Sequence, residues 1–266
     1  MVKTIRSGDA QIAYEIIGKG APVLLLHPFP VHHEFWLRVV EILREEFCFI
    51  LPDLRGHGDS DAGEGPITME KHAGDIAEIL DEEKIGRAPM AGVSIGGYAL
   101  FEFWRGHRER VTALGLFNTK AQADNAEARA TRLQAAAGVL ERGTEQFFLS
   151  MTPKLMAKST HSLRPDLVEG ALRMMRKATA EDIAAIQRGM AERPDSIETL
   201  KSISVPTLIV TGDEDAMTGA PEAEFMRQRI AGSEMKIIPR AGHYSPWEQP
   251  QAASELLREF LSSQRL

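Results

Sequence analysis

The chain has 266 residues, of which 43% are hydrophobic and 26% are charged, as in an ordinary globular protein long enough for one large core. Its formal net charge of -7, with no cluster of Lys or Arg, argues against a nucleic-acid partner, because phosphate binding needs a basic surface. No apolar run approaches the roughly twenty residues of a membrane span and residues 1–7 contain no apolar signal region, so we expect a cytoplasmic protein without a membrane partner.

The first 120 residues alternate apolar runs with helical patterns. Residues 1–18 predict an edge hairpin of two strands, and the uninterrupted apolar run at 22–27 is typical of a strand buried on both faces. Cys48 is the only cysteine, which excludes an internal disulfide bond, and its apolar neighbours predict a small buried residue. Further strands are expected at 47–52, just before the turn at 92–96, and at 111–118, with helices at 34–46, 68–84 and from that turn to about 107.

Residues 121–202 contain only helical patterns, which cover 127–142, 145–151, 165–177, 180–192 and 195–202. A strand pattern returns at 205–211, and a helix at 221–230, a strand at 234–239 and a closing helix at 251–263 follow it. Strands that alternate with helices indicate βαβ units, so the predicted fold class is α/β, with a mostly parallel, doubly wound sheet of about eight strands flanked by helices. We expect a core domain of residues 1–120 and 203–266, and an inserted helical cap (lid), residues 121–202, over the carboxyl edge of the sheet.

Gly92-Val93-Ser94-Ile95-Gly96 has the pattern Gly-x-Ser-x-Gly between an apolar run and a helical segment. A strand that turns at once into a helix crowds the positions two residues either side of the serine, so glycine fits there and the hydroxyl is exposed at the sheet edge. Alone, the pattern is equally compatible with a tight turn that carries a capping serine.

A serine nucleophile needs a base, and the base needs a carboxylate that orients it. The chain supplies Ser94, Asp215 and His243 in that order, each just beyond the carboxyl end of a predicted strand. Asp213 is the alternative carboxylate in the same turn, where it could instead bond the turn's own backbone. The order nucleophile, acid, histidine differs from those of chymotrypsin and subtilisin.

The sequence resembles the α/β-hydrolase superfamily over nearly its whole length. The matching segments are His27-Pro28-Phe29-Pro30, residues 53–60, the serine motif, Gly212-Asp213-Glu214-Asp215, and Gly242-His243 with Glu248-Gln249-Pro250 after it. The resemblance implies that Asp215 is the acid, since the family places it at the fourth position of this turn. It also implies that the backbone N–H groups of Phe29 and Ile95 form the oxyanion hole. Pro28 stands where the family commonly has glycine, and it removes a donor that the hole does not need.

The remaining candidates have structural interpretations. His27, His32 and His33 have no partner at metal-ligand spacing, so no metal site is predicted. We expect His57 to bond within its own loop, His72, His107 and His161 to face solvent, and Asp53 to hold loops together. Phe29 and Trp36 are expected near the substrate pocket. Most of the bulky apolar residues of the cap should pack its helices, and these are Phe147, Phe148, Met151, Leu155, Met156, Met174 and Met175.

Together, motif and resemblance predict a serine hydrolase, a carboxylesterase-like enzyme that cleaves a small-molecule ester or lactone through an acyl-enzyme on Ser94, without a cofactor. Lactonase or enol-lactonase, C–C bond hydrolase and perhydrolase chemistry stay open because they use the same triad. A serine at position 94 argues against the dehalogenases and epoxide hydrolases of the superfamily, which have an aspartate there. A ligand-sensing receptor on the same fold is the non-enzyme alternative, and a homodimer is left open.

Overall fold

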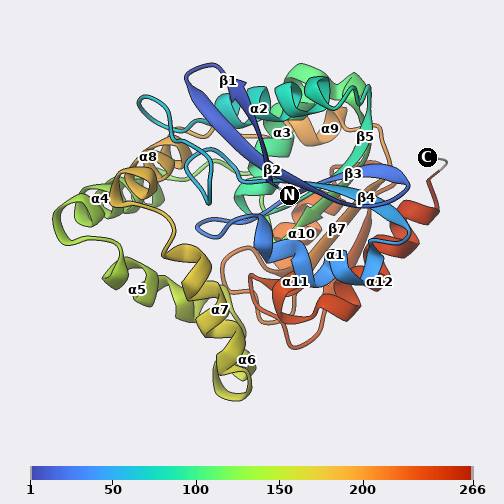
Figure 1. Cartoon of the computed structure of the whole chain (residues 1–266). Helices are drawn as coiled ribbons and strands as arrows, with labels where there is room; N and C mark the ends of the chain where they lie inside the picture. The colour runs from blue at the N-terminus through green and yellow to red at the C-terminus, as the bar shows by residue number, and fades with distance from the viewer. Residues whose placement is uncertain (1, 265–266) are drawn as a thin grey trace.

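A computed structural model describes residues 2–264, and one sheet of eight strands forms its centre (Figure 1). The strand order is β1-β2-β4-β3-β5-β6-β7-β8, with β2 antiparallel to β1 and β4 and every other pair parallel. The strands are β1 (Val2–Ser7), β2 (Ala10–Gly18), β3 (Ala21–Leu26), β4 (Phe47–Pro52), β5 (Ala88–Val93), β6 (Val111–Phe117), β7 (Thr207–Gly212) and β8 (Glu234–Ile238). The predicted α/β fold class and its edge hairpin are confirmed.

Helices cover both faces of the sheet (Figure 1). On one face α2 packs against α3, and on the other α1 packs against α12. The helices that flank the sheet are α1 (Leu37–Leu43), α2 (Met69–Glu82), α3 (Ile95–His107), α10 (Ala220–Arg227), α11 (Ser245–Glu248) and α12 (Pro250–Ser262), with short 3-10 helices at His33–Trp36 and Arg108–Arg110. No helix within residues 2–264 is long and apolar enough to cross a membrane.

Strand position explains the sequence patterns. The central strands β5 and β7 are buried at every position, and therefore show no alternation of apolar and polar residues; their only polar residues are Thr207 and Thr211 of β7. At the edges, β1 and β8 are largely exposed. Cys48, at the second position of β4, is only half-buried, which corrects the expectation of full burial.

Six helices lie between β6 and β7. These are α4 (Ala126–Arg142), α5 (Glu145–Leu155), α6 (Lys158–Leu163), α7 (Pro165–Met175), α8 (Ala180–Ala191) and α9 (Ile197–Ser202). The first five project beyond the sheet at the left and bottom of Figure 1, whereas α9 packs against α3. The sequence patterns missed α6 and α11, helices of six and four residues, although α9, also of six residues, falls within the helix predicted at 195–202.

Helix α8 is held against the loop that precedes α2. The Ile67 backbone N–H donates to the Ala185 carbonyl at 3.1 Å. One turn further along α8, a Cβ added to Gly189 would lie 1.7 Å from the Ile67 carbonyl oxygen, so only glycine allows this approach.

His72 corrects another expectation, because it is fully buried in α2 rather than exposed. Neither of its ring nitrogens has a hydrogen-bond partner among the residues that the structure describes. Burial, followed by the charges of His57 and Arg55, lowers the pKa of His72 to about 3. His107 and His161 are half-buried, with the His107 ring stacked on that of Phe103 at 4.9 Å between centroids.

Replacing Gly189 by alanine should lower the free energy of unfolding by about 2–3 kcal/mol, because the new methyl group would displace the Ile67 carbonyl from α8. Gly74→Ala is the matched control. Gly74 lies inside α2, a Cβ there would meet nothing within 4 Å, and alanine should raise the free energy of unfolding by about 0.5–1 kcal/mol. Urea unfolding measures both variants, and equal effects of the two substitutions would contradict this account of the contact.

His72→Leu should make the protein less sensitive to acid. Unfolded histidine takes up a proton near pH 6.5, whereas buried His72 stays neutral down to a pKa of about 3, so unfolding takes up a proton within this window. Stability is therefore complete above about pH 6.5 and falls as the pH decreases, by about 2 kcal/mol at pH 5 from this residue alone. Urea unfolding at pH 7.5 and pH 5 should show a loss that is smaller by about this amount in the variant. Equal losses in the two proteins would rule out the titration of His72 as a cause.

Candidate active site

Ser94 occupies a strained turn between β5 and α3, with φ 54° and ψ -112°. Two glycines make the turn possible. A Cβ on Gly92 would lie 2.5 Å from the carbonyl carbon of Gly96, and one on Gly96 would lie 2.8 Å from the Leu26 carbonyl oxygen. Non-glycine residues adopt a positive φ only where their surroundings hold them there, and such positions concentrate at functional sites.

Hydrogen bonds on both sides hold this strained residue. The Ser94 N–H donates to the Phe117 carbonyl at 3.0 Å, and the Thr119 hydroxyl donates to the Ser94 carbonyl at 2.8 Å. The backbone of Ser94 is thereby fixed to the carboxyl end of β6, the neighbouring strand.

Asp215 and His243 meet beyond the ends of β7 and β8. The Nδ1 atom of His243 lies 3.2 and 3.1 Å from the two carboxylate oxygens of Asp215, and both side chains are almost completely buried. Asp213 does not take part in this pair. It is exposed, and its carboxylate accepts from the Ala241 N–H at 3.2 Å.

Several further donors converge on the Asp215 carboxylate. The N–H groups of Met217 and Thr218 donate at 2.8 and 3.1 Å, and the Thr218 hydroxyl donates at 3.0 Å. The side-chain amide of Asn118 donates at 2.9 Å. Burial alone would raise the pKa of the Asp215 carboxyl, but the charge and hydrogen bond of His243 and the donors Asn118 and Met217 hold it well below its usual range. The carboxylate is therefore ionised, as a group that orients a histidine must be.

Sequence reasoning missed Asn118 and Thr218. Asn118 also donates to the Gly242 carbonyl at 3.1 Å and accepts from the Ser245 hydroxyl at 2.5 Å, so it ties the Asp215 turn to the loop of His243. The Thr218 hydroxyl oxygen lies 3.1 Å from His243 Nδ1. The signal available in the sequence was position, because Asn118 directly follows an apolar strand run and Thr218 lies three residues after Asp215.

Ser94 and His243 face one cavity of about 90 Å³. Its lining comes from strand-end loops and from helices α3, α4, α5 and α8, and consists of Phe29, Ser94, Tyr98, Lys120, Arg132, Met151, Leu155, Gln187, Met190, Met217, Thr218 and His243. A wider cavity of about 600 Å³ adjoins it and shares Lys120, Arg132, Met151 and Gln187 with it. Ser94 and His243 thus lie at the narrow end of a larger space.

Phe29 lines this cavity, whereas Trp36 lies elsewhere. The Trp36 side chain is fully buried, with its ring edge-on to those of Phe35 and Phe117. Of the seven bulky apolar residues expected to pack the cap, Met151 and Leu155 line the inner cavity and Phe147 the wider one, while Phe148, Met156, Met174 and Met175 are packed in the core.

The family resemblance implies an oxyanion hole made of two backbone N–H groups, those of Ile95 and Phe29. Ile95 is the first residue of α3, where helix geometry leaves the N–H without an intrahelical partner. Neither the Ile95 nor the Phe29 N–H has a hydrogen-bond acceptor within residues 2–264. The Phe29 carbonyl accepts from the Tyr244 hydroxyl at 2.9 Å, which holds the Phe29 loop beside His243. Pro28 fits this loop, where its carbonyl lies 3.0 Å from His27 Nδ1.

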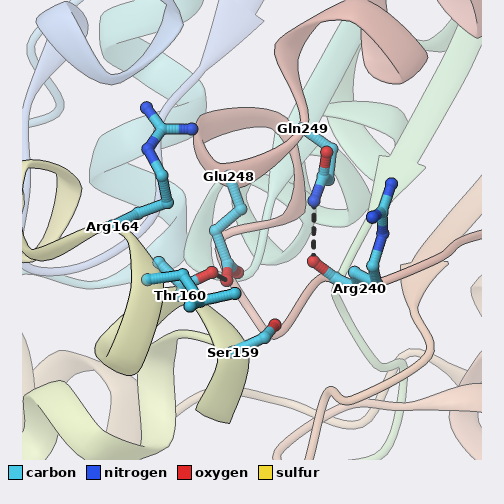
Figure 2. Close-up of a pocket in the computed structure, with 7 residues that line it drawn as sticks. Ser159, Thr160, Arg164, Arg240, Glu248 and Gln249 are labelled. Atoms are coloured by element: carbon cyan, nitrogen blue, oxygen red, sulfur yellow. Dashed lines mark hydrogen bonds between the residues drawn. The ribbon is translucent and has the colours of Figure 1, made fainter.

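Glu248 joins the His243 loop to helix α6, and Figure 2 shows its carboxylate directed toward Thr160. One oxygen accepts from the Thr160 hydroxyl and the Ala157 N–H at 2.5 and 2.8 Å. The other accepts from the Gly242 N–H at 2.8 Å. Burial raises the pKa of the Glu248 carboxyl, although these three hydrogen bonds oppose the shift. The position of His243 is therefore linked to a helix inserted between β6 and β7.

Asp53 has the structural role that was expected. One of its carboxylate oxygens accepts from the His33 N–H and lies 2.7 Å from His33 Nδ1, and the other accepts from the Asp59 N–H at 2.9 Å. His57 bonds carbonyls of its own loop at 3.1 and 3.2 Å, also as expected. Potential metal-ligand atoms of His32, His33 and Glu34 lie within 4.8 Å of one another. One of the two ring nitrogens of His33, Nδ1, is already paired with the Asp53 carboxylate at 2.7 Å.

Comparison with known proteins identifies the family. Residues 21–250 match the family model described as alpha/beta hydrolase fold. The chain is similar to a malate-bound thermophilic esterase from Thermogutta terrifontis, with 37% identity, a TM-score of 0.95, and coverage of 99% of this chain and 98% of that one. It is 29% identical to 3-oxoadipate enol-lactonase 1 of Acinetobacter baylyi, covering 87% of this chain and 85% of that protein. It is 27% identical to 3-oxoadipate enol-lactonase 2 of the same organism, covering 94% and 92%. The chain belongs to the alpha/beta hydrolase fold family.

Proposed function

We propose that the protein is a serine hydrolase of carboxylic esters in which Ser94 is the nucleophile, His243 the base and Asp215 the orienting acid. One observation carries the proposal. The strained Ser94 and the His243 ring line the same cavity, and the far side of that ring is held by a buried, ionised carboxylate. The esterase from Thermogutta terrifontis, 37% identical over nearly the whole chain, supports the same reaction class.

Acylation uses all of these groups, and His243 acts first as base and then as acid. His243 Nε2 takes the proton of the Ser94 hydroxyl while the serine oxygen attacks the acyl carbon of the ester. The N–H groups of Phe29 and Ile95 donate to the oxyanion of the tetrahedral intermediate. When the intermediate collapses, the C–O bond of the ester breaks, and the alcohol leaves with the proton from His243. Asp215 stays ionised throughout and stabilises the imidazolium.

Deacylation repeats these steps with water. His243 takes a proton from the water as its oxygen attacks the acyl-enzyme, and then returns that proton to Ser94 as the acid is released. Each proton moves between groups of this chain, the substrate and water, so the mechanism calls on no cofactor.

A lactone is the second candidate substrate, and the similarity to two 3-oxoadipate enol-lactonases favours it specifically. A lactone is a cyclic ester, so the same steps open it, except that the alcohol stays attached to the acyl group. C–C bond hydrolysis and perhydrolysis use the same three side chains. A panel of esters and lactones of graded acyl length separates the ester and lactone candidates and gives the preferred acyl length.

We also propose that residues 121–202 act as a cap over a core of residues 1–120 and 203–266. Helices α5 and α8 support this division, because their side chains close the cavity over Ser94. Helix α9, the last in the segment, packs on α3 and connects the cap back to the sheet. A cytoplasmic location and a homodimer stay predictions.

Ser94→Ala should lower kcat for p-nitrophenyl acetate by at least about a thousandfold, because the acyl-enzyme no longer forms. His243→Ala should cause a similar loss. Sustained release of p-nitrophenol by the unmodified protein is the measurement. Unchanged turnover in both variants would disprove the triad assignment, and a single-turnover burst without recovery would favour a receptor over an enzyme.

Thr218→Val should lower kcat by about tenfold. The variant loses one hydrogen bond that orients the Asp215 carboxylate, and we expect this loss to raise the activation free energy by about 1.5 kcal/mol. Valine has nearly the shape of threonine, so the variant removes the hydroxyl without opening a cavity. Thr218→Ser keeps the hydroxyl and is the matched control, with kcat expected within about twofold of the unmodified protein. Equal losses in both variants would mean that the methyl group matters rather than the hydroxyl.

A further inference from the structure

Three cationic side chains gather around one buried carboxylate beside the catalytic cavity. Asp124 has a side chain only 2% exposed. Arg132 hydrogen-bonds one of its oxygens, and Lys120 Nζ and Arg193 Nη2 each lie 3.4 Å from the other. Burial alone would raise the pKa of Asp124, but the hydrogen bond and the three positive charges hold it below its usual range. The carboxylate is therefore ionised and neutralises only one of three cations.

The positive charge that Asp124 does not neutralise lies next to the cavity. Lys120 and Arg132 line both the inner cavity, with Ser94 and His243, and the wider cavity next to it. Arg132 Nη1 has only long contacts there, at 3.3 Å to Gln187 Oε1 and 3.3 Å to Met190 Sδ. These are weak partners for a guanidinium donor.

Arg193 adds a partly satisfied positive charge directly behind the cavity wall, with its Nη2 atom donating to the Gln122 carbonyl at 2.7 Å. Its side chain is 2% exposed, and its Nε and Nη1 atoms have no hydrogen-bond partner in the described part of the chain. Its Cζ atom lies 4.0 Å from the ring centroid of Tyr98, which itself lines the inner cavity. Unpaired N–H groups on a buried guanidinium are costly, and a nearby anion would offset that cost.

The other charged groups of the wider cavity do not change this balance. Glu127 and Lys154 also line it, but they are exposed and opposite in charge. In a chain whose formal net charge is -7, the cap side of the catalytic cavity is thus locally positive. A negative group is attracted to such a surface and held there more strongly than in water.

We propose that Lys120 and Arg132 bind a carboxylate of the substrate, so that the enzyme prefers esters or lactones with a negative group a few bonds from the reacting carbonyl. The distance between the negative group and the reacting carbonyl must be short, because Lys120, Arg132 and Ser94 all line the same small inner cavity. Its volume of about 90 Å³ is that of about three water molecules. The proposal rests on the proposed esterase function and specifies its substrate class.

Two pairs of esters of nearly equal shape test the proposal. Monoethyl succinate is compared with ethyl 4-methylpentanoate for an acyl-side carboxylate, and 4-acetoxybutanoate with 4-methylpentyl acetate for an alcohol-side one. We expect a higher kcat/KM for the charged member of at least one pair. Lys120→Met should lower that charged-to-neutral ratio by about tenfold or more, the effect of losing one charge-assisted hydrogen bond.

Lys158→Met is the control, because Lys158 is an exposed residue of α6 that lines neither cavity. Its charged-to-neutral ratio should equal that of the unmodified protein. A ratio that Lys120→Met leaves unchanged, or a preference for the neutral ester in both pairs, would overturn the proposal while Ser94-dependent hydrolysis of neutral esters continued. Loss of the proposed function has a different signature, since Ser94→Ala would then leave the hydrolysis of all four esters unaffected.

Binding of succinate by calorimetry gives a readout that does not depend on turnover. The dissociation constant should rise by about tenfold in Lys120→Met relative to Lys158→Met. Equal affinity in the two variants would contradict the proposal. Thermal unfolding of Lys120→Met separates a loss of the anion site from a loss of the fold.

Discussion

Burying the Asp215 carboxylate would cost several kcal/mol if its oxygens were left without partners, and the carboxyl edge of the sheet is built around meeting that requirement. The donors come from beyond three different strands, with Asn118 after β6, Thr218 after β7 and His243 after β8. Because the Asp215 carboxylate is bonded from three strand ends, it aligns the loops that carry Asn118, Thr218 and His243 with one another. Burial makes an unpaired Asp215 carboxylate costly, and it also strengthens the electrostatic interaction between that carboxylate and His243.

The helices inserted between β6 and β7 are joined by hydrogen bonds to the loop that carries His243. Glu248 connects Thr160 to the N–H of Gly242, and the Tyr244 N–H donates to the Leu155 carbonyl at 2.9 Å. Met151 and Leu155, from the same insertion, supply wall for the cavity. The helices that line the cavity beside Ser94 therefore also help to position His243.

The sheet could be predicted from the sequence because burial leaves a direct record in it. Strands covered on both faces are uninterrupted apolar runs, and the crowding around Ser94 demands glycine at two fixed positions. These signals are local, and so were the predictions that the structure confirmed. Asp53 and His57, placed in a structural loop by their immediate neighbours, belong to the same group.

What escaped prediction depends on contacts between segments far apart in the chain. The burial of His72 depends on the packing of α2 against the sheet and the loop of His57, and a helical pattern does not reveal that packing. Asn118 acts through atoms of residues 215, 242 and 245, which no spacing rule connects to it. Trp36 was predicted near the pocket, but it is packed in the core. The sequence alone does not show whether an aromatic residue lines a cavity or packs against other side chains.

The bond network of Glu248 also bears on how a substrate enters. Moving α6 aside would pull on Gly242 and disturb the histidine next to it, so an opening at that helix would disable the site that it exposes. The wider cavity, lined largely by α4 and α5, reaches the inner one without crossing these bonds. Entry along that route leaves the catalytic geometry assembled between turnovers, and it brings the incoming molecule past Lys120 and Arg132 before it reaches Ser94.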